Sequence, residues 1–436
     1  MRDYLNVDVN SSKIEILVVG GGFVGLTLAA KLLKNSNTNL IVLENNLEKI
    51  SKFRIKEYGI FEPGLDEALN SGIDKSRLKF VSDLSELKFN LAFICINTNK
   101  GELNRIDKLS DLIDTLTKHL VNSGQIYLRS TVPVGTTTKI HKSLKASLRN
   151  DLMIFYAPER TAEGIALSEL DSLPQIIGSP VLSEVEIGKK MLHSLGFEVI
   201  ETENSESAEF IKCMCNIWRD TTFAISNEFA VFAEDLNLDI FEIIEKANFR
   251  YPRSKIPKPG PVGGPCLSKD TYLFLESLSE DLATDSIILK SRKLNENLVN
   301  IASKVISDYV GNNPNQNKIC FLGAAFKGNP RTNDFRNSFT QELIHVIKDK
   351  KFEIRVWDPT IISDDLLEYS VYFEKELRSK DMNIVVIGNN ADFVIDTLAL
   401  DFLKALGPAA LIIDMWGITR SLENIEAQIY RFGSKA

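Results

Sequence analysis

Short apolar runs alternate with amphipathic stretches in the first third of the chain. Five such runs are bounded by turn signals, a pattern typical of buried strands. We predict these strands at 15–20, 40–44, 91–96, 125–130 and 152–157. Segments of helical periodicity, such as 25–35 and 106–121, lie between them. Strands that alternate with helices in this way predict a parallel, doubly wound sheet.

The pattern changes in the middle of the chain and then returns. Residues 205–237 read as one long helix, with no Gly or Pro inside. A loop rich in Pro and Gly follows at 250–268, and then more helix to about residue 308. After a polar, turn-like stretch at 309–317, four further buried strands are predicted at 318–323, 352–358, 382–388 and 410–417.

The predicted fold class is therefore α/β, with two doubly wound parallel-sheet domains joined by a helical middle domain. A length of 436 residues suggests two or three domains of ordinary size. We place their boundaries at 1–204, 205–308 and 309–436.

Composition and charge narrow the class of protein. The chain is 44% hydrophobic and 25% charged, as in globular proteins, and its net charge is −8. An acidic balance argues against a nucleic-acid-binding protein. The most apolar stretch, 16–30, is interrupted by glycines and is too short for a membrane span. The N-terminus lacks the layout of a signal peptide, so we expect a cytoplasmic protein with no membrane partner.

The cysteines and histidines argue against a metal site. Five scattered cysteines form no CxxC pair, and none of the four histidines lies near another. A disulfide framework and a cysteine-based zinc site are therefore excluded as interpretations. Metal catalysis is not expected either.

A glycine-rich turn follows the first predicted strand. The segment from Gly20 through Gly22 to Gly25 satisfies GxGxxG, and Glu44 ends the next strand. This context predicts a Rossmann-like dinucleotide site. Gly20 allows the turn, Gly22 lets the backbone approach a pyrophosphate, and Gly25 lets the helix meet the strand. Glu44 would bind ribose hydroxyls and repel a 2′-phosphate, which favours NAD over NADP. The alternative is a glycine-rich turn without a nucleotide.

A cysteine in an unusual setting is the second candidate. Cys266 follows a rigid loop that contains Gly263 and Gly264, and Lys269 lies three residues later. The lysine would favour the thiolate, the form that attacks a carbonyl. The alternative is a buried cysteine after a turn.

Three further segments carry polar side chains. Glu209, Lys212 and Asn216 share one face of the long helix, where an ammonium and an amide could hold an oxyanion. The alternative is a solvated salt-bridge face. The loops at 130–136 and 157–164 follow strands, which is where function usually lies in such sheets. Alternatively, each is only a helix cap or a turn.

Taken together, these segments resemble the UDP-glucose/GDP-mannose dehydrogenase family along nearly the whole chain. Further matching motifs are 61–65 (FEPGL), 95–98 (CINT), 227–228 (NE), 323–327 (GAAFK) and 334–338 (DFRNS). The family oxidises the C6 alcohol of a nucleotide sugar to a carboxylate with two NAD. The resemblance therefore implies NAD as cofactor, a UDP-sugar substrate, a role in making precursors of surface polysaccharides, and a homodimer through the helical middle.

The resemblance also implies roles for individual residues. Cys266 would carry a thiohemiacetal and then a thioester, with Lys212 and Asn216 steadying the charged oxygen. Asp270 and Thr131 would position water and shuttle protons, and Glu159 would be the base for hydrolysis. The implied cofactor-binding residues are Gly20, Gly22, Phe23, Val24, Gly25, Glu44, Lys49, Thr98, Thr131, Glu163, Lys269 and Arg336.

The implied substrate site contains one residue that would reach a neighbouring subunit, Arg253. The full set of implied substrate-binding residues is Glu159, Arg160, Thr161, Lys212, Asn216, Arg253, Gly260, Gly263, Gly264, Phe326 and Lys327.

Departures from the family pattern bear on the substrate. The run 259–267 resembles the UDP-N-acetylhexosamine branch, although Pro265 stands where many of its members have His. The segment between Lys327 and Asp334 is two residues longer than in common UDP-glucose enzymes, and the pair Asn389-Asn390 has no assigned role. UDP-glucose 6-dehydrogenase is the alternative. A two-electron hydroxyacid dehydrogenase and a non-catalytic nucleotide-sugar binding protein are more remote.

Overall fold

The computed structural model divides into two compact units. It describes residues 13–85, 87–98, 105–146, 149–253, 255–348, 352–361, 372–373, 377 and 382–434. The first unit comprises Met1–Cys215 and Tyr272–Ser279, and the second comprises Asn216–Thr271 and Glu280–Ala436.

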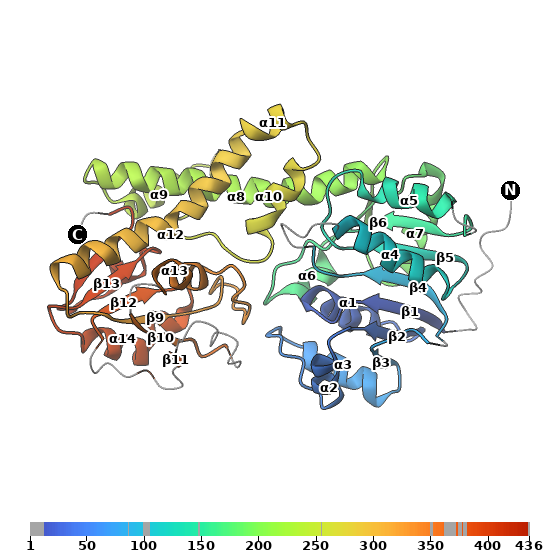
Figure 1. Ribbon diagram of the computed structural model, residues 1–436, viewed down its shortest axis with the longest axis horizontal. Helices are drawn as coiled ribbons and strands as arrows, with labels where there is room; N and C mark the ends of the chain where they lie inside the picture. The colour runs from blue at the N-terminus through green and yellow to red at the C-terminus, as the bar shows by residue number, and fades with distance from the viewer. Residues whose placement is uncertain are drawn as a thin grey trace. The chain divides into compact units, whose positions relative to one another are not determined.

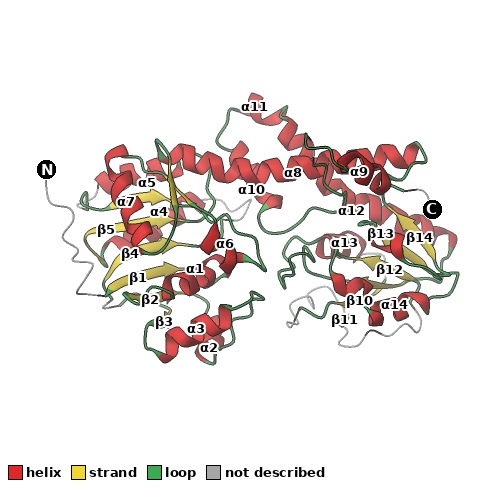
Figure 2. Ribbon diagram, turned by 180° about the vertical axis from the view of Figure 1, so that it is seen from behind, coloured by secondary structure: helices red, strands yellow, loops and turns green. Residues whose placement is uncertain are grey.

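The first unit is built on a parallel sheet of six strands with the order β3-β2-β1-β4-β5-β6. Alternate residues of the central strand β1 face two separate apolar cores: Ile16 and Val18 join one, and Leu17 and Val19 join the other. Helices therefore cover both faces of the sheet, as Figure 2 shows. The strands are β1 (Ile14–Val19), β2 (Thr38–Leu43), β3 (Leu78–Val81), β4 (Phe89–Ile94), β5 (Leu120–Leu128) and β6 (Met153–Tyr156).

Seven whole helices and a small two-stranded sheet also belong to the described part of the first unit. The helices are α1 (Phe23–Leu33), α2 (Leu47–Arg54), α3 (Leu65–Asp74), α4 (Arg105–Thr117), α5 (Thr136–Ala146), α6 (Ala166–Ser172) and α7 (Leu182–Ser194). The small sheet pairs β7 (Gln175–Ile177) with β8 (Val199–Glu201).

The second unit repeats the strand order of the first, as β11-β10-β9-β12-β13-β14. Its strands are β9 (Lys318–Leu322), β10 (Glu353–Trp357), β11 (Tyr372–Phe373), β12 (Ile384–Ile387), β13 (Leu411–Asp414) and β14 (Gln428–Arg431). Helices α13 (Phe339–Ile347) and α14 (Thr397–Lys404) accompany them, with short 3-10 turns at Asp392–Ile395 and Ile418–Ser421.

The helical middle contributes to the core of this second sheet. Its helices are α8 (Ser205–Asp235), α9 (Ile240–Asn248), α10 (Leu267–Leu275), α11 (Glu280–Thr284) and α12 (Ile287–Asn312). Ala230 of α8, Phe241 of α9 and Leu298 of α12 share one apolar cluster with Ile319 of β9. The labelled helices can be followed in Figure 1, where α8 is green and α12 is orange.

These observations confirm the predicted fold class of two parallel α/β sheets with a helical middle. All nine predicted strands exist, with ends that differ by a few residues. The unpredicted strands are β3, β7, β8, β11 and β14. The domain boundaries at 204/205 and 308/309 stay predictions. Among the described residues, no helix is long and apolar enough to cross a membrane.

Candidate active site

The glycine-rich turn has the backbone that a dinucleotide requires. Gly20 has φ +104°, and a Cβ there would lie 2.7 Å from the Cys95 carbonyl oxygen. A Cβ on Gly25 would lie 1.9 Å from the Gly20 carbonyl oxygen, so the turn and α1 touch backbone to backbone. A Cβ on Gly22 would meet nothing within 4 Å, and no side chain caps α1 there. The N-terminus of α1 is therefore open to an anion, and Phe23 and Val24 form its first turn.

Glu44 stands directly after β2 with its carboxylate oriented by backbone groups. The N–H of Gly21 donates to Oε2 at 3.1 Å, and the N–H of Asn46 donates to Oε1 at 3.0 Å. A carboxylate has about four acceptor positions, so each oxygen keeps one for a ribose hydroxyl. These residues fit NAD. Lys49 lies on α2, exposed to solvent.

The carboxyl ends of β4 and β5 bring two threonines together. The Thr98 hydroxyl donates to the carbonyl of Thr131 at 2.6 Å. Because β1, β4 and β5 are parallel neighbours, these loops and the glycine-rich turn follow the same edge of the sheet.

Glu159 follows β6 and is held on both oxygens. Oε2 forms an ion pair with Arg129, and Oε1 accepts from the N–H groups of Arg160 at 2.8 Å and Thr161 at 2.9 Å. Burial opposes ionisation, but Arg129 and these N–H groups outweigh it and hold the pKa of Glu159 below its ordinary value. These contacts favour the ionised carboxylate, which holds the backbone of its loop through the two N–H groups. Arg129 was not predicted as a site residue, because it falls within the predicted strand 125–130; in the structure it directly follows β5.

A second carboxylate supports the same loop from elsewhere in the first unit. Glu62, in the FEPGL motif, accepts from the N–H of Gly164 at 2.7 Å and of Leu167 at 3.1 Å. It therefore ties down the turn that carries Glu163. The Thr161 hydroxyl is buried with no hydrogen-bond partner among the described residues.

The polar face of α8 is not solvated at its first two predicted positions. Glu209 is completely buried and accepts from the N–H groups of Gly135 at 2.5 Å and Thr137 at 2.8 Å, which caps α5. Burial raises its pKa to about 7. Lys212 is 7% exposed, and within the described part of the chain its ammonium has no hydrogen-bond or ion-pair partner. A solvated salt-bridge face is therefore the wrong interpretation for this pair.

In the second unit, Cys266 directly precedes α10 and is exposed, so the interpretation of a buried cysteine is wrong. One turn later Asp270 is 1% exposed. Its Oδ2 accepts from Asn216 Nδ2 at 2.6 Å, and its Oδ1 accepts from Lys269 Nζ at 2.8 Å. Four predicted residues thus lie together.

The loop before Cys266 packs on the segments that carry Phe326 and Arg336. A Cβ on Gly264 would lie 2.5 Å from the Phe326 ring, and one on Gly263 would lie 2.2 Å from the Asn337 carbonyl oxygen. Lys327 Nζ lies 5.5 Å from the centre of the Phe326 ring. Arg336 pairs with Asp334 at the surface.

Asn389 and Asn390, to which the sequence assigned no role, brace this same region. Asn389 Nδ2 donates to the Ala325 carbonyl at 3.1 Å, and the N–H of Gly328 donates to Asn390 Oδ1 at 2.9 Å. They therefore fix both ends of the turn that carries Phe326 and Lys327.

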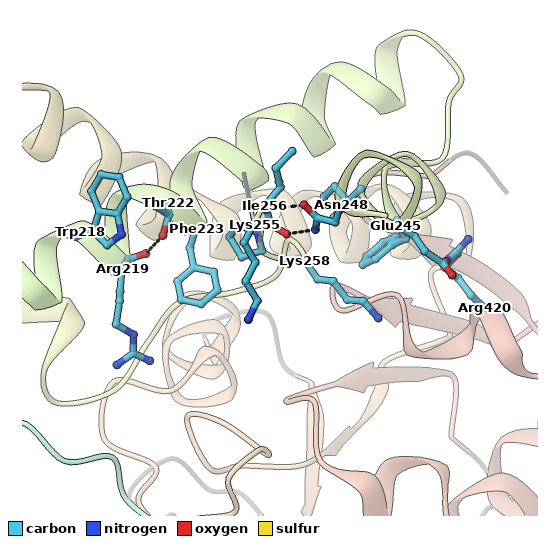
Figure 3. Close-up of a pocket in the computed structure, with 13 residues that line it drawn as sticks. Trp218, Arg219, Thr222, Phe223, Glu245, Asn248, Lys255, Ile256, Lys258 and Arg420 are labelled. Carbon is cyan, nitrogen blue, oxygen red and sulfur yellow. Dashed lines mark hydrogen bonds between the residues drawn. The ribbon is translucent and has the colours of Figure 1, made fainter. Parts of the chain in front are cut away.

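A groove of about 1000 Å³ in the second unit was not predicted (Figure 3). Aromatic side chains and cationic ones line it. They include Trp218, Phe223, Arg219, Lys255, Lys258 and Arg420. Lys255 and Lys258 stand between Arg253 and Gly260 in the loop that leads to Cys266, and that basic run was the available sequence signal. Arg253 itself is exposed, with its guanidinium 5.9 Å from the Tyr251 ring centre.

The predicted site residues divide between the two units. The first unit holds the predicted cofactor turn, Thr131, the loop 159–163 and Lys212, and the second holds Asn216, Arg253, the loop 260–270 and the residues near 326–336. Among the described residues, no group of three or more His, Cys, Asp and Glu could hold a metal ion.

Comparison with known proteins identifies the family. Three models of the UDP-glucose/GDP-mannose dehydrogenase family match the chain: the NAD binding domain at 14–195, the central domain at 206–297 and the UDP binding domain at 320–421.

Individual relatives agree with these models. The chain is 31% identical over 358 residues to a UDP-N-acetyl-D-mannosamine dehydrogenase of Pyrococcus horikoshii, covering 80% of this chain and 84% of that one. It is 28% identical to a UDP-glucose 6-dehydrogenase of Rickettsia prowazekii, covering 97% and 100%. A solved structure, the UDP-D-ManNAc dehydrogenase from Pyrococcus horikoshii, superposes with a TM-score of 0.80 at 27% identity, covering 96% of this chain and 99% of that one. The chain is an NAD-dependent dehydrogenase and belongs to the UDP-glucose/GDP-mannose dehydrogenase family.

Proposed function

We propose that the protein oxidises the C6 alcohol of a UDP-N-acetylhexosamine to the uronic acid, a precursor for surface polysaccharide, in the cytoplasm. The observation that carries this proposal is the exposed Cys266 at the start of α10, one turn before an Asp270 that binds both Asn216 and Lys269. UDP-glucose is the alternative substrate, since UDP-glucose 6-dehydrogenases are also among the relatives.

The proposed reaction is a four-electron oxidation through Cys266. NAD accepts one hydride in each of the two oxidations. In the first, C6 loses a hydride and the hydroxyl loses a proton, which leaves an aldehyde. The Cys266 thiolate then adds to C6, and loss of a second hydride from C6 converts the thiohemiacetal to a thioester. Water adds, the C–S bond breaks, and the carboxylate and the thiolate are released together with two protons.

The side chains proposed as catalytic have the chemistry that these steps need. Lys212, nearly buried and without a partner among the described residues, is available to an oxyanion. Asn216 is oriented by Asp270, which with Thr131 would position water. We propose Glu159 as the base for hydrolysis; its pairing with Arg129 keeps it ionised but also makes it a weaker base.

We further propose how the ligands are held. The cofactor would lie against the turn 20–25, with Glu44 and Lys49 at the ribose end and Thr98, Thr131, Glu163, Lys269 and Arg336 among its other contacts. The nucleoside diphosphate would occupy the groove lined by Arg219, Lys255, Lys258 and Arg420, whose charges suit two phosphates and whose aromatic rings suit a base. The sugar would contact Arg160, Thr161, Gly260, Gly263, Gly264, Phe326 and Lys327.

The experiment that tests the substrate is a panel with NAD: UDP-glucose and the UDP derivatives of N-acetylglucosamine, N-acetylmannosamine and N-acetylgalactosamine. We expect an acetamido sugar to give the highest kcat/KM and two NADH per sugar. A tenfold preference for UDP-glucose, about 1.4 kcal/mol, would overturn the branch but not the family. One NADH per sugar would indicate two-electron chemistry, and none would indicate a binding protein.

Cys266→Ser is the matched test of the nucleophile. We expect acid formation to stop while NAD affinity is unchanged, because an alcohol cannot replace the thiolate. Mass spectrometry of the products decides it, and wild-type acid production by this variant would contradict the thioester.

We also propose a homodimer through the helical middle, with domains at 1–204, 205–308 and 309–436. Large apolar side chains of α8 are exposed, which supports an interface there. They include Met214, Trp218, Ile225, Phe229 and Phe232. Arg253→Ala should raise the substrate KM, and mixing it with Cys266→Ser should restore activity if Arg253 acts across subunits. No recovery despite proven subunit exchange would count against sharing.

A further inference from the structure

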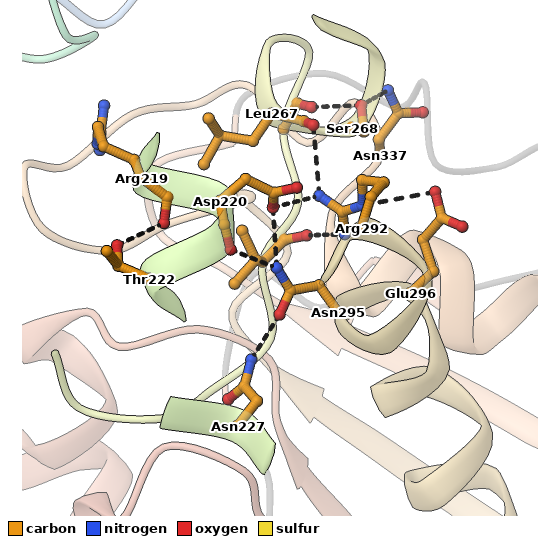
Figure 4. Close-up of polar contacts among 12 residues, drawn as sticks. Arg219, Asp220, Thr222, Asn227, Leu267, Ser268, Arg292, Asn295, Glu296 and Asn337 are labelled. Atoms are coloured by element: carbon orange, nitrogen blue, oxygen red, sulfur yellow. Dashed lines mark hydrogen bonds and ion pairs between the residues drawn. The ribbon is translucent and has the colours of Figure 1, made fainter. Parts of the chain in front are cut away.

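A buried polar cluster in the second unit connects two long helices to the loop that presents Cys266 (Figure 4). Its members are Asp220 and Asn227 on α8 and Arg292 and Asn295 on α12. Their exposed fractions are 1%, 0%, 1% and 2%, so the group is sealed from solvent. A buried charge is costly unless it is paired, so the charged members of this cluster depend on their hydrogen-bond partners.

Arg292 donates hydrogen bonds to two backbone carbonyls of the loop. Its NH2 donates to the Val262 carbonyl at 3.0 Å and its NH1 to the Leu267 carbonyl at 3.3 Å. Its NH1 also donates to Asp220 Oδ1 at 2.7 Å, which supplies the opposite charge. The planar guanidinium presents its donors in a fixed fork, so these three contacts define one orientation. Val262 and Leu267 lie on either side of Cys266 in the sequence.

The two asparagines connect this network to the backbone of Gly260. Asn227 Oδ1 accepts from the Gly260 N–H at 2.8 Å, and its Nδ2 donates to the Gly260 carbonyl at 3.1 Å. Asn227 Nδ2 also donates to Asn295 Oδ1 at 2.8 Å, and Asn295 Nδ2 donates to Asp220 Oδ1 at 2.8 Å. The loop is therefore fastened at three backbone points by one continuous network.

We propose that Arg292 is a positioning residue for the nucleophile: with Asp220, Asn295 and Asn227 it holds the loop 260–267 so that the Cys266 thiol meets the C6 aldehyde. The inference rests on the proposed function of Cys266. A reacting group misplaced by about 1 Å can lose on the order of 100-fold in rate. The first oxidation needs no thiol, whereas the second does. Loosening the loop should therefore impair acid formation more than aldehyde formation.

The test compares Arg292→Lys with the wild type. Lysine keeps the charge beside Asp220 but loses the fork that reaches both carbonyls. We expect acid formation to fall more than tenfold and the NADH produced per sugar to fall from two toward one, with aldehyde trapped as a hydrazone. The NAD Kd should stay within twofold. The rate at which iodoacetamide alkylates Cys266, followed by peptide mass spectrometry without substrate, should change at least fivefold.

Two control variants separate positioning from stability. Glu296→Gln alters the residue 3.5 Å from Arg292 Nε but keeps the hydrogen bonds of Arg292 to the loop carbonyls, and it should leave both readouts unchanged. Leu298→Ala weakens the core beneath α12 and should lower the unfolding temperature while keeping two NADH per sugar. If Arg292→Lys does not fold, Asn227→Ala serves instead, with the same direction of change.

The outcomes distinguish the two proposals. If a folded Arg292→Lys keeps both the wild-type stoichiometry and the wild-type alkylation rate, the positioning role is wrong. The same holds if Leu298→Ala changes the stoichiometry equally, because the effect would then be one of stability. Failure of the proposed function itself appears separately, as acid formation by Cys266→Ser.

Discussion

The two sheets share one strand order but treat the turn after their central strand differently. After β1 the chain turns at Gly20, and α1 begins at Phe23. After β9 it turns at Gly323, with φ +96°, but the next helix, α13, begins only at Phe339. The first turn therefore places a helix N-terminus where a phosphate could bind, and the second does not.

The acidic residue after the neighbouring strand shows the same contrast. Glu44 accepts one backbone N–H on each oxygen. Asp358 is saturated: its Oδ2 accepts from the N–H groups of Ala324 at 2.7 Å and Ala325 at 3.1 Å, and its Oδ1 accepts from the N–H and the hydroxyl of Thr360. Topology alone thus does not make a dinucleotide site; the turn must leave its N–H groups and its carboxylate available.

The largest expected effect comes from Gly25→Ala, for which Gly388→Ala is a matched control. A Cβ at either position would lie 1.9 Å from the carbonyl oxygen of the turn glycine, Gly20 or Gly323. We expect Gly25→Ala to displace α1 and weaken NAD binding by about 100-fold, corresponding to roughly 3 kcal/mol. Gly388→Ala should lower stability with an unchanged NAD Kd. Calorimetric titration measures the NAD Kd of both variants. Equal losses of NAD affinity would contradict the assignment of the NAD site to the first turn alone.

The stability of the first unit should depend on pH because Glu209 titrates there. Its folded pKa of about 7 exceeds its ordinary value of 4.5, so the native state binds the proton more tightly. The resulting stability is present below about pH 4.5 and is lost as pH rises through 7. The shift corresponds to about 3 kcal/mol. Glu209→Gln should flatten this slope in urea unfolding between pH 5 and 8.

Glu234→Gln is the corresponding variant in the second unit. Burial also raises the pKa of Glu234, which accepts from the Gly433 N–H at 2.8 Å. In calorimetric scans, Glu209→Gln and Glu234→Gln should each change the pH dependence of a different unfolding transition. An unchanged slope in Glu209→Gln would contradict the raised pKa.

Asp358→Asn should cost about 1–3 kcal/mol of stability, because an amide cannot accept all four hydrogen bonds and leaves buried N–H groups unpaired. The NAD Kd should not change. Denaturant unfolding and NAD titration on the same sample provide the check; weakened NAD binding would mean that the second turn takes part in cofactor binding.

The smallest effect is expected at the matching acid of the first sheet. Glu44→Gln removes the charge that repels a 2′-phosphate, so the preference for NAD over NADP should fall by about tenfold, or roughly 1.4 kcal/mol. Steady-state kcat/KM with each cofactor measures it. A wild type that already used both equally would show that Glu44 does not select the cofactor.

The sequence alone determined most of the architecture and much of the chemistry. Buried strands such as β1 and β9 can be recognised locally because they carry enough consecutive apolar residues. The glycines whose Cβ positions are blocked by backbone can be recognised too, because they form a local motif. The strands that were missed are short or lie at an edge. β7 and β8, for example, have three residues each and form by pairing with one another. Their stability comes from that pairing and not from a pattern.

The tertiary structure decided which polar residues are partners. Arg129 and Glu159 are thirty positions apart, and Asp220 and Arg292 are seventy-two apart, yet each pair is buried and in contact. No periodicity links such positions, because hydrogen bonding between distant segments depends on how the sheets and helices pack. The same packing lets Asn389 and Asn390 hydrogen-bond the turn that carries Phe326. It also leaves Cys266 exposed, whereas a sequence motif can only suggest that a cysteine is accessible. A sequence names candidate groups; which of them are paired, buried or open to a ligand is set by the electrostatic cost of burial in the folded chain.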